Sequence, residues 1–208
     1  PPVARGAPRL AGGRGRAYSC MIRVATRRVS ARAPWHLRRH LSSQAQPTHL
    51  DTWITENEAA FAPPVMNKLM HREQLSIMFV GGPNERTDFH LEEGSEFFYQ
   101  LRGHMELPTL QSGKRVNVKI REGDVFLLPS RIPHSPQRPE TGSIGLVVER
   151  QRYEDEPPDG LRFYVDFQKC DAVLWERYFQ CYDLGKDLAP IVAAYRESEE
   201  HRTGKPTG

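Results

Sequence analysis

Short apolar segments separated by turns constrain the fold of this chain most strongly. Each segment is bounded by glycine, proline or other turn-forming residues, and the segments recur at roughly 8 to 12 residues, as strands of an all-β domain do. The segments are 75–80, 96–101, 105–110, 115–120, 125–128 and 144–149. No internal repeat accompanies them. The pattern predicts a mainly β fold, either a barrel or a sandwich.

Helical patterns flank the predicted strands on both sides. Residues 48–61 read as a short capped helix that Pro63 and Pro64 end, because proline cannot continue a helix. After the linker-like run EDEPPDG, residues 171–179 and 187–196 show helical spacing of apolar positions. We therefore expect short helices before and after the β domain.

The charge distribution divides the chain into unlike parts. No acidic residue precedes Asp51, and ten of the 29 Lys and Arg residues lie before it, so the chain from Asp51 onward holds all 26 acids and a net charge of −7. The overall pI of 8.9 is thus no argument for nucleic-acid binding. We expect an Arg-rich leader over 1–46, a catalytic barrel over 47–155, and a linker with a helical segment over 156–208.

The leader itself has more than one reading. Its Arg-rich, Ser-containing and acid-free composition is typical of a mitochondrial transit peptide, and Met21 makes a credible start. A disordered tail, or translated upstream sequence, is the plainer interpretation.

Cysteine content and hydropathy exclude several classes of protein. The chain has three cysteines and no C-x-x-C pair, which argues against a disulfide framework and against a cysteine-rich zinc site. A reducing compartment fits best. No window approaches 18 consecutive apolar residues, so no membrane span is expected.

His90, Glu96 and His134 form the constellation that carries chemistry. His90 and Glu96 flank the start of a predicted strand, and His134 follows a turn after another buried strand. Two imidazoles and one carboxylate on one face of a metal leave other positions open, as Fe(II) oxygenases require. Glu92 and Glu93 lie between the first two and are expected in a solvated turn.

The spacing around these residues resembles the two cupin motifs. Glu96-(x6)-Gly103 matches the end of the first motif, and Gly123-(x5)-Pro129-(x4)-His134 matches the second. The expected fold is therefore a cupin, a double-stranded β-helix or jelly-roll barrel.

The departures from the cupin motifs are informative. The first histidine of H-x-H is Asp88, the gap from His90 to Glu96 is longer than usual, and the closing asparagine is Arg138. These changes predict three ligands instead of four, with an arginine beside the metal. Arg131 occupies the usual glycine position, where we expect a surface or packing role.

Longer stretches resemble one family within the cupins, 3-hydroxyanthranilate 3,4-dioxygenase. The resemblance covers roughly residues 50–205. The stretches that carry it are NKLMHREQLSIMFVGGPN, RTDFHLEEGSEFFYQLRG, GDVFLLPSRIPHSPQRP, GLVVERQR, DGLRFYV and CYDLGKDLAPI. It implies one Fe(II) per chain, O₂ as co-substrate and 3-hydroxyanthranilate as the molecule opened. The implied product is 2-amino-3-carboxymuconate semialdehyde, which closes to quinolinate on the route from tryptophan through kynurenine to NAD.

The resemblance also implies a role for each matching residue. The metal ligands would be His90, Glu96 and His134, the catalytic residues Arg86 and Glu149, and the substrate-binding residues Arg86, Glu96, Arg138 and Glu149. In physical terms, Arg138 can hold the substrate carboxylate through a bidentate pair. Glu149 can accept a proton from the substrate, and Arg86 can stabilise negative charge that builds on dioxygen.

The chain also departs from its family. A second, rubredoxin-like iron, held in some bacterial members by paired C-x-x-C motifs, is not expected here. Animal-type members continue into a second, degenerate cupin half beyond the RTGKP segment, whereas this sequence ends at Gly208. We therefore expect a fragment of a longer protein.

Alternative functions remain open from the sequence. They are another cupin metalloenzyme such as a thiol dioxygenase or sugar isomerase, a non-enzymatic storage cupin, and an inactive truncated family member. The family resemblance favours a cytoplasmic monomer or homodimer, with the mitochondrion second because of the leader.

Overall fold

The computed structural model describes residues 46–63 and 66–207. The predictions for the leader 1–46 fall almost entirely outside these residues. The fold described below belongs to the unit that begins at Thr48.

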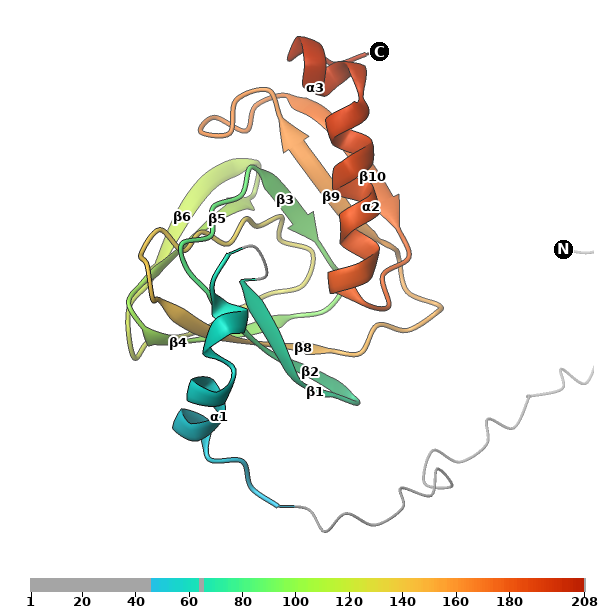
Figure 1. Ribbon diagram of the computed structural model, residues 1–208. Helices are drawn as coiled ribbons and strands as arrows, with labels where there is room; N and C mark the ends of the chain where they lie inside the picture. The colour runs from blue at the N-terminus through green and yellow to red at the C-terminus, as the bar shows by residue number, and fades with distance from the viewer. Residues whose placement is uncertain (1–45, 64–65, 208) are drawn as a thin grey trace, which may run out of the picture. The chain divides into compact units, whose positions relative to one another are not determined.

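One wall of the fold is an antiparallel sheet of five strands in the order β1-β2-β8-β4-β7 (Figure 1). The strands are β1 Asn67–Arg72, β2 Leu75–Gly81, β8 Ile144–Arg150, β4 Glu96–Arg102 and β7 Val125–Leu128. Four of them were predicted with boundaries within one residue, and β1 was not predicted.

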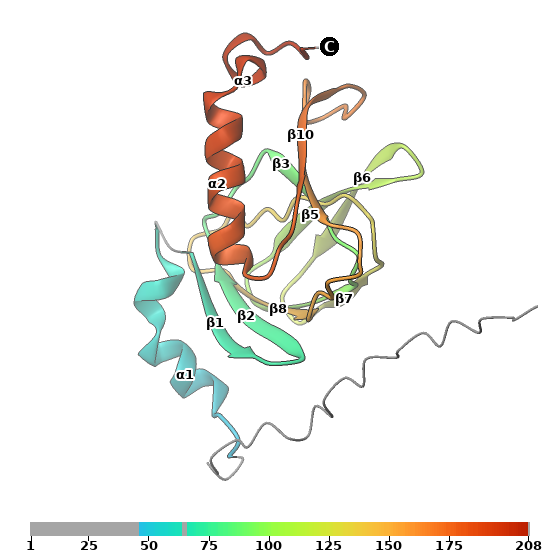
Figure 2. The ribbon, with the colours of Figure 1, turned by 90° about the vertical axis from the view of Figure 1, so that its right-hand side faces the viewer.

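The other wall is built from two smaller sheets (Figure 2). The first has the order β10-β9-β3 and the second pairs β5 with β6. These strands are β10 Val173–Phe179, β9 Asp159–Tyr164, β3 Asp88–Leu91, β5 Met105–Gln111 and β6 Lys114–Ile120. Residues 134–138 connect the two sheets, because His134 forms a bridge with His90 of β3 and another with Thr109 of β5.

The core lies between the two walls. Its fully enclosed members come from both sides: Phe98, Leu128 and Val147 from the larger sheet, and Met105, Leu107 and Ile120 from β5 and β6. Burial alternates along β4, so Glu96, Phe98 and Gln100 all face inward. The prediction of a mainly β fold is confirmed.

Helices pack outside the strands, as expected. The N-terminal pattern forms α1 Leu50–Glu56 and the 3₁₀ helix η2 Glu58–Phe61. The C-terminal pattern forms α2 Leu184–Glu197, followed by α3 Glu199–Thr203. Figure 1 shows α2 running beside β9 and β10, where the Tyr195 ring stacks on Phe163 at 3.5 Å between centroids. Within the described part of the chain, no helix is both long and apolar enough to cross a membrane.

One predicted element is wrong: residues 171–179 form no helix, and Val173–Phe179 within them form the strand β10. They pair antiparallel with β9, whose first residues lie in the predicted linker. A short apolar run is compatible with a helix or a strand. Here it forms a strand because it pairs with β9, a strand that the sequence did not predict. Residues 156–208 therefore supply two strands to the second wall as well as the predicted helix.

Arg131 has a backbone conformation that explains the usual glycine of the cupin motif. Its φ is +61°, in the left-handed region where a Cβ is strained. Its side chain is exposed and pairs with Glu93, a contact of small energetic value.

This strain leads to a stability prediction. Arg131→Gly and Arg131→Ala both remove the ion pair, but only glycine removes the strain. We expect the glycine variant to be more stable than the alanine variant by about 1 kcal/mol in urea unfolding. Equal stabilities of the two variants would contradict this reading of the turn.

Candidate active site

Backbone pairing sets the positions of His90 and His134. The amide of His90 donates to the carbonyl of His134 at 2.8 Å, and the amide of His134 donates back at 3.0 Å. Two residues that exchange both bonds stand directly opposite each other, so their side chains leave the sheet on the same face. Glu96, at the start of β4, reaches the same space from the other wall.

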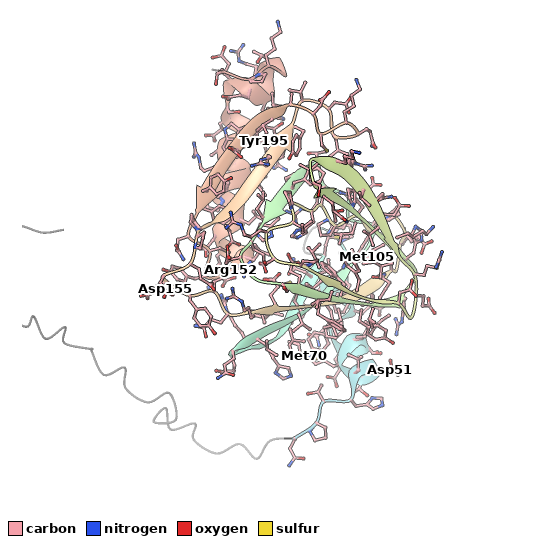
Figure 3. The ribbon with its side chains drawn as sticks, turned by 180° about the vertical axis from the view of Figure 1, so that it is seen from behind. Asp51, Met70, Met105, Arg152, Asp155 and Tyr195 are labelled. Atoms are coloured by element: carbon pink, nitrogen blue, oxygen red, sulfur yellow. The ribbon has the colours of Figure 1, made fainter. Side chains whose placement is uncertain are left out.

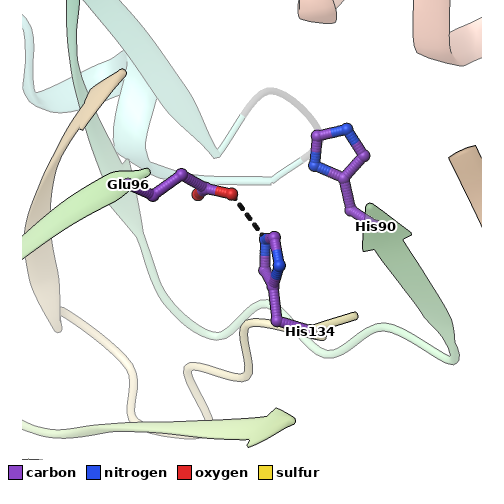
Figure 4. Close-up of side chains that lie close together, drawn as sticks. All are labelled: His90, Glu96 and His134. Atoms are coloured by element: carbon purple, nitrogen blue, oxygen red, sulfur yellow. Dashed lines mark ion pairs between the residues drawn. The ribbon is translucent and has the colours of Figure 1, made fainter. Parts of the chain in front are cut away.

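The three side chains present their ligand atoms to one point. One atom from each of His90, Glu96 and His134 lies within 4.8 Å of the others, and all three residues are buried (Figure 4). The structure thus brings together the predicted metal-ligand candidates. Asp88, which replaces a fourth ligand in the motif, is not part of this group.

The contact between Glu96 and His134 fits a shared cation. Glu96 Oε1 lies 2.7 Å from His134 Nε2, and this enclosed oxygen has no other polar partner among the described residues. His134 Nδ1 lies 2.9 Å from the carbonyl of Ile132, to which it can donate, leaving the Nε2 lone pair free for a metal. Ligand atoms bound at about 2.1 Å and right angles lie about 3 Å apart, close to the spacing seen.

Asp159 orients the His90 ring from the side opposite Glu96 and His134. Its Nε2 lies 2.8 Å from Asp159 Oδ2, a distance at which an imidazole N–H donates to a carboxylate. Figure 4 shows one ring nitrogen of His90 turned toward Glu96 and His134 and the other turned away from them. A site of two imidazoles and one carboxylate suits a divalent transition metal and leaves positions for other ligands.

Glu96 and His134 stabilise each other's charged forms. Burial alone would raise the pKa of Glu96, but His134 and then His90 outweigh it and lower the pKa to about 2. Burial would lower the pKa of His134, but the Glu96 carboxylate holds it above the ordinary value. The Glu96 carboxylate thus favours the form of His134 that carries a proton on both ring nitrogens.

This proton makes metal binding pH-dependent. A cation must displace it, so below the raised pKa of His134 the apparent Co(II) affinity should fall about tenfold for each unit of pH. Spectroscopic titrations with Co(II) between about pH 6 and pH 8 would measure the slope. An affinity that does not change over this range would show that His134 does not exchange a proton for the metal.

Arg138 is a buried cation without a matching anion. It is 2% exposed, its Nε has no hydrogen-bond partner among the described residues, and its Nη2 lies 3.6 Å from the Met105 sulfur. Burial, and then the nearby Arg86, lower the pKa of Arg138 to about 10. Because an unpaired buried charge is costly, this guanidinium fits an anionic ligand.

A glycine in β8 makes room for Arg138. A Cβ on Gly145 would lie 2.9 Å from Arg138 Nη2 and 2.5 Å from Gln100 Oε1. The arginine therefore packs directly on the strand.

The other two predicted residues lie near the ligand group. Glu149 of β8 stands beside Glu96 of β4 in the sheet register. Burial, and then the Glu96 carboxylate, raise the pKa of Glu149. Arg86 pairs with Asp88, with Nε donating to Oδ1 at 3.2 Å. Asp88, which stands where the cupin motif has its first histidine, therefore binds Arg86 and is not among the metal-ligand candidates.

One cavity of about 620 Å³ joins these groups. All six predicted site residues line it: Arg86, His90, Glu96, His134, Arg138 and Glu149. Residues along α2, from Leu184 to Glu197, also line it, and Arg72 of β1 binds Asp183 there at 2.7 Å. The structure therefore unites the whole predicted set in a single pocket that a helix partly covers.

Arg152 and its partners were missed in the sequence. Arg152 binds the carboxylates of Glu92, Glu149 and Asp159. The prediction that Glu92 lies in a solvated turn is wrong, because this residue is 5% exposed. Its partner Arg152 is 60 positions away, which no local pattern reveals. The available signal was that Arg152 and Asp159 lie in two of the stretches that carry the family resemblance.

Comparison with known proteins identifies the family of this chain. The family model described as 3-hydroxyanthranilic acid dioxygenase matches residues 42–196. The 3-hydroxyanthranilate 3,4-dioxygenase of Rattus norvegicus is 57% identical over 155 residues, covering 74% of this chain and 53% of that protein. The Homo sapiens enzyme of the same name is 57% identical over 154 residues, covering 74% and 52%. The chain thus spans about half the length of the curated relatives it matches.

Structural comparison finds a crystal structure of a cupin-2 domain containing protein from Shewanella frigidimarina. The two share 13% identity at a TM-score of 0.40, over 47% of this chain and 92% of that one. Family membership follows from the sequence matches and not from this likeness. The chain belongs to the 3-hydroxyanthranilic acid dioxygenase family.

Proposed function

We propose that this chain carries an Fe(II)-dependent dioxygenase site that opens the ring of 3-hydroxyanthranilate with O₂ to give 2-amino-3-carboxymuconate semialdehyde. The observation that carries the proposal is the unpaired, buried Arg138 in the same cavity as His90, Glu96 and His134. A cation-binding group beside a carboxylate-binding arginine suits an aromatic acid that is also a metal ligand. The names of the relatives point to the same substrate.

Iron is the metal that this donor set and the family favour, with one ion per chain. His90, Glu96 and His134 would hold it, as the convergence of their ligand atoms and the Nδ1 contact that leaves His134 Nε2 facing Glu96 support. When bound, Fe(II) supplies a redox-active Lewis acid with open coordination positions.

Arg138 orients the substrate. Its guanidinium can bind the substrate carboxylate through two parallel hydrogen bonds, and the low dielectric of a buried site strengthens such a pair. Because Arg138 rests on Gly145, the carboxylate is held at a fixed place in the cavity. This fixes which ring carbons face the metal ligands.

Glu149 and Arg86 manage charge and protons. Glu149, with a raised pKa, is suited to take the proton of the substrate hydroxyl and to hold it in a buried site. Arg86 places positive charge on the cavity wall, where it can stabilise negative charge that develops on dioxygen. Apolar residues such as Phe98 and Val147 line the same cavity and limit the entry of water.

Oxygen uptake by the iron-loaded chain tests this function. With 3-hydroxyanthranilate, the chain should consume O₂ and form a product that absorbs in the near ultraviolet. Anthranilate lacks the hydroxyl and 2-aminophenol lacks the carboxylate, so neither should be turned over at a comparable rate. A chain shown by metal analysis to hold iron, yet inactive with 3-hydroxyanthranilate, would refute the proposal and favour a binding role. Turnover of a thiol or a sugar would favour another cupin enzyme.

The proposal includes a reducing compartment, the cytoplasm first and the mitochondrion second. Cys170 and Cys181 support it, because both are free, buried thiols. We propose a monomer or homodimer that binds no nucleic acid, with a catalytic barrel that begins at residue 47 and takes β9 and β10 from the segment 156–208. Light scattering after size exclusion would decide the oligomeric state.

A further inference from the structure

We propose that Asp159 and Arg152 are positioning residues that support the metal site from outside: Asp159 fixes the His90 ring, and Arg152 takes the place of a second cation among the neighbouring carboxylates. The inference rests on the proposed function only in that a divalent metal binds His90, Glu96 and His134. We call Arg152 with Glu92, Glu149 and Asp159 the Arg152 cluster.

Each nitrogen of the Arg152 guanidinium is committed to a carboxylate. Nε lies 3.0 and 2.9 Å from the two oxygens of Asp159, and Nη1 lies 2.9 Å from Glu149 Oε2. Nη2 binds Glu92. The three carboxylates come from the turn after β3, from β8 and from the first residue of β9. One side chain therefore holds together three segments of the barrel next to the ligand group.

Asp159 connects Arg152 to His90, one of the metal-ligand candidates. Its Oδ2 lies within hydrogen-bond distance of both His90 Nε2, at 2.8 Å, and Arg152 Nε, at 2.9 Å. An imidazole that donates from Nε2 keeps its lone pair on Nδ1, the nitrogen on the side of Glu96 and His134. Carboxylates in this outer position orient ligand histidines and make them more basic. Since Asp159 belongs to β9, the paired partner of β3, the strand pair supplies both histidine and carboxylate.

The Arg152 cluster also contains a second potential cation site. One ligand atom from each of His90, Glu92 and Asp159 lies within 4.8 Å of the others. Two of these residues already bind Arg152. The guanidinium therefore supplies the positive charge that a metal would otherwise bring, and it keeps the metal stoichiometry at one.

The variant Asp159→Asn tests the role of Asp159 without removing volume. The loss of the carboxylate should weaken Co(II) binding by about 10- to 100-fold, as for other outer-shell partners. Asp155→Asn is the matched control, since Asp155 is exposed on the same connection between β8 and β9 (Figure 3). Co(II) titration followed by absorption measures binding without substrate or turnover. An unchanged affinity in Asp159→Asn would overturn the role of Asp159.

The variant Arg152→Gln tests the second part. With the guanidinium gone, Glu92 and Asp159 should attract a cation, and the chain should bind a second Co(II). Arg150→Gln is the control, because Arg150 pairs with Glu156 outside the Arg152 cluster. A single Co(II) bound with unchanged affinity would overturn the role of Arg152.

A third variant, Arg152→Lys, tests the same role if Arg152→Gln does not fold. Arg152→Lys keeps one positive charge but cannot bind three carboxylates through separate nitrogens. It should bind a single Co(II), more weakly than the unchanged chain. Unchanged affinity in this folded variant would also overturn the role of Arg152.

The outcomes separate this inference from the proposed function. If the unchanged chain binds Co(II) but shows no ring opening with iron, the proposed function fails and the positioning roles still stand or fall by the titrations. If ring opening occurs but Asp159→Asn binds metal normally, only this inference fails.

Discussion

His134→Ala is expected to reduce ring opening to the background rate and to abolish tight metal binding. The change removes one of two imidazoles and leaves a site of one imidazole and one carboxylate. It also leaves the buried Glu96 carboxylate without the partner that lies 2.7 Å away. Breaking a buried pair in this way should lower the stability of the metal-free chain by about 3 kcal/mol. Metal analysis, oxygen uptake and urea unfolding would measure the three effects.

His104→Ala is the matched control for this change. His104 also pairs with a carboxylate, Glu140 at 2.6 Å, but it does not line the cavity. It should retain metal and activity. If His134→Ala kept its metal and turned over substrate, the assignment of the ligand group would be wrong.

Arg138→Leu is expected to lower kcat/KM for 3-hydroxyanthranilate by about 1,000-fold. Loss of one partner from a buried charge pair costs about 4 kcal/mol, which corresponds to that factor. Metal affinity should change little, because Arg138 is not in the ligand group. Steady-state oxygen uptake and Co(II) titration together would separate substrate binding from metal binding.

A stability measurement makes the Arg138 prediction more specific. In the absence of substrate, the arginine is a buried charge without a matching anion, so Arg138→Leu should melt no lower than the unchanged chain. Arg138→Lys keeps the charge but offers no planar pair of donors, and should recover only part of the activity. Full activity in Arg138→Leu would show that the carboxylate is bound elsewhere.

Local spacing predicted which three side chains would lie together and most of the strands of the barrel. The apolar run over 96–101 predicts β4, but polarity does not give its inward face, because Glu96 and Gln100 are buried while the apolar residues between them at 97 and 99 are half-buried. The turn residues around Gly123 and Pro129 placed His134 after a strand. Such signals are contained in a few consecutive residues.

The features that were missed depend on contacts between distant parts of the chain. Glu92 looks like a turn residue until Arg152, 60 positions later, folds against it. The run 171–179 becomes a strand because β9 is beside it. In both cases the outcome depends on a distant partner that the local sequence does not identify. The contact between Asp159 and His90 likewise joins residues far apart in the sequence.

The hydrogen-bonded pair of His90 and His134 has a thermodynamic consequence. This pair is part of the seam where residues 134–138 join β3 to β5. The two histidines proposed as metal ligands reach their common point only when the seam is closed, since each comes from one side of it. Free energy of metal binding at this pair would therefore also stabilise the closed barrel. Because the two histidines stand on opposite sides of the seam, metal binding and closure of the barrel would be thermodynamically coupled, and each would favour the other.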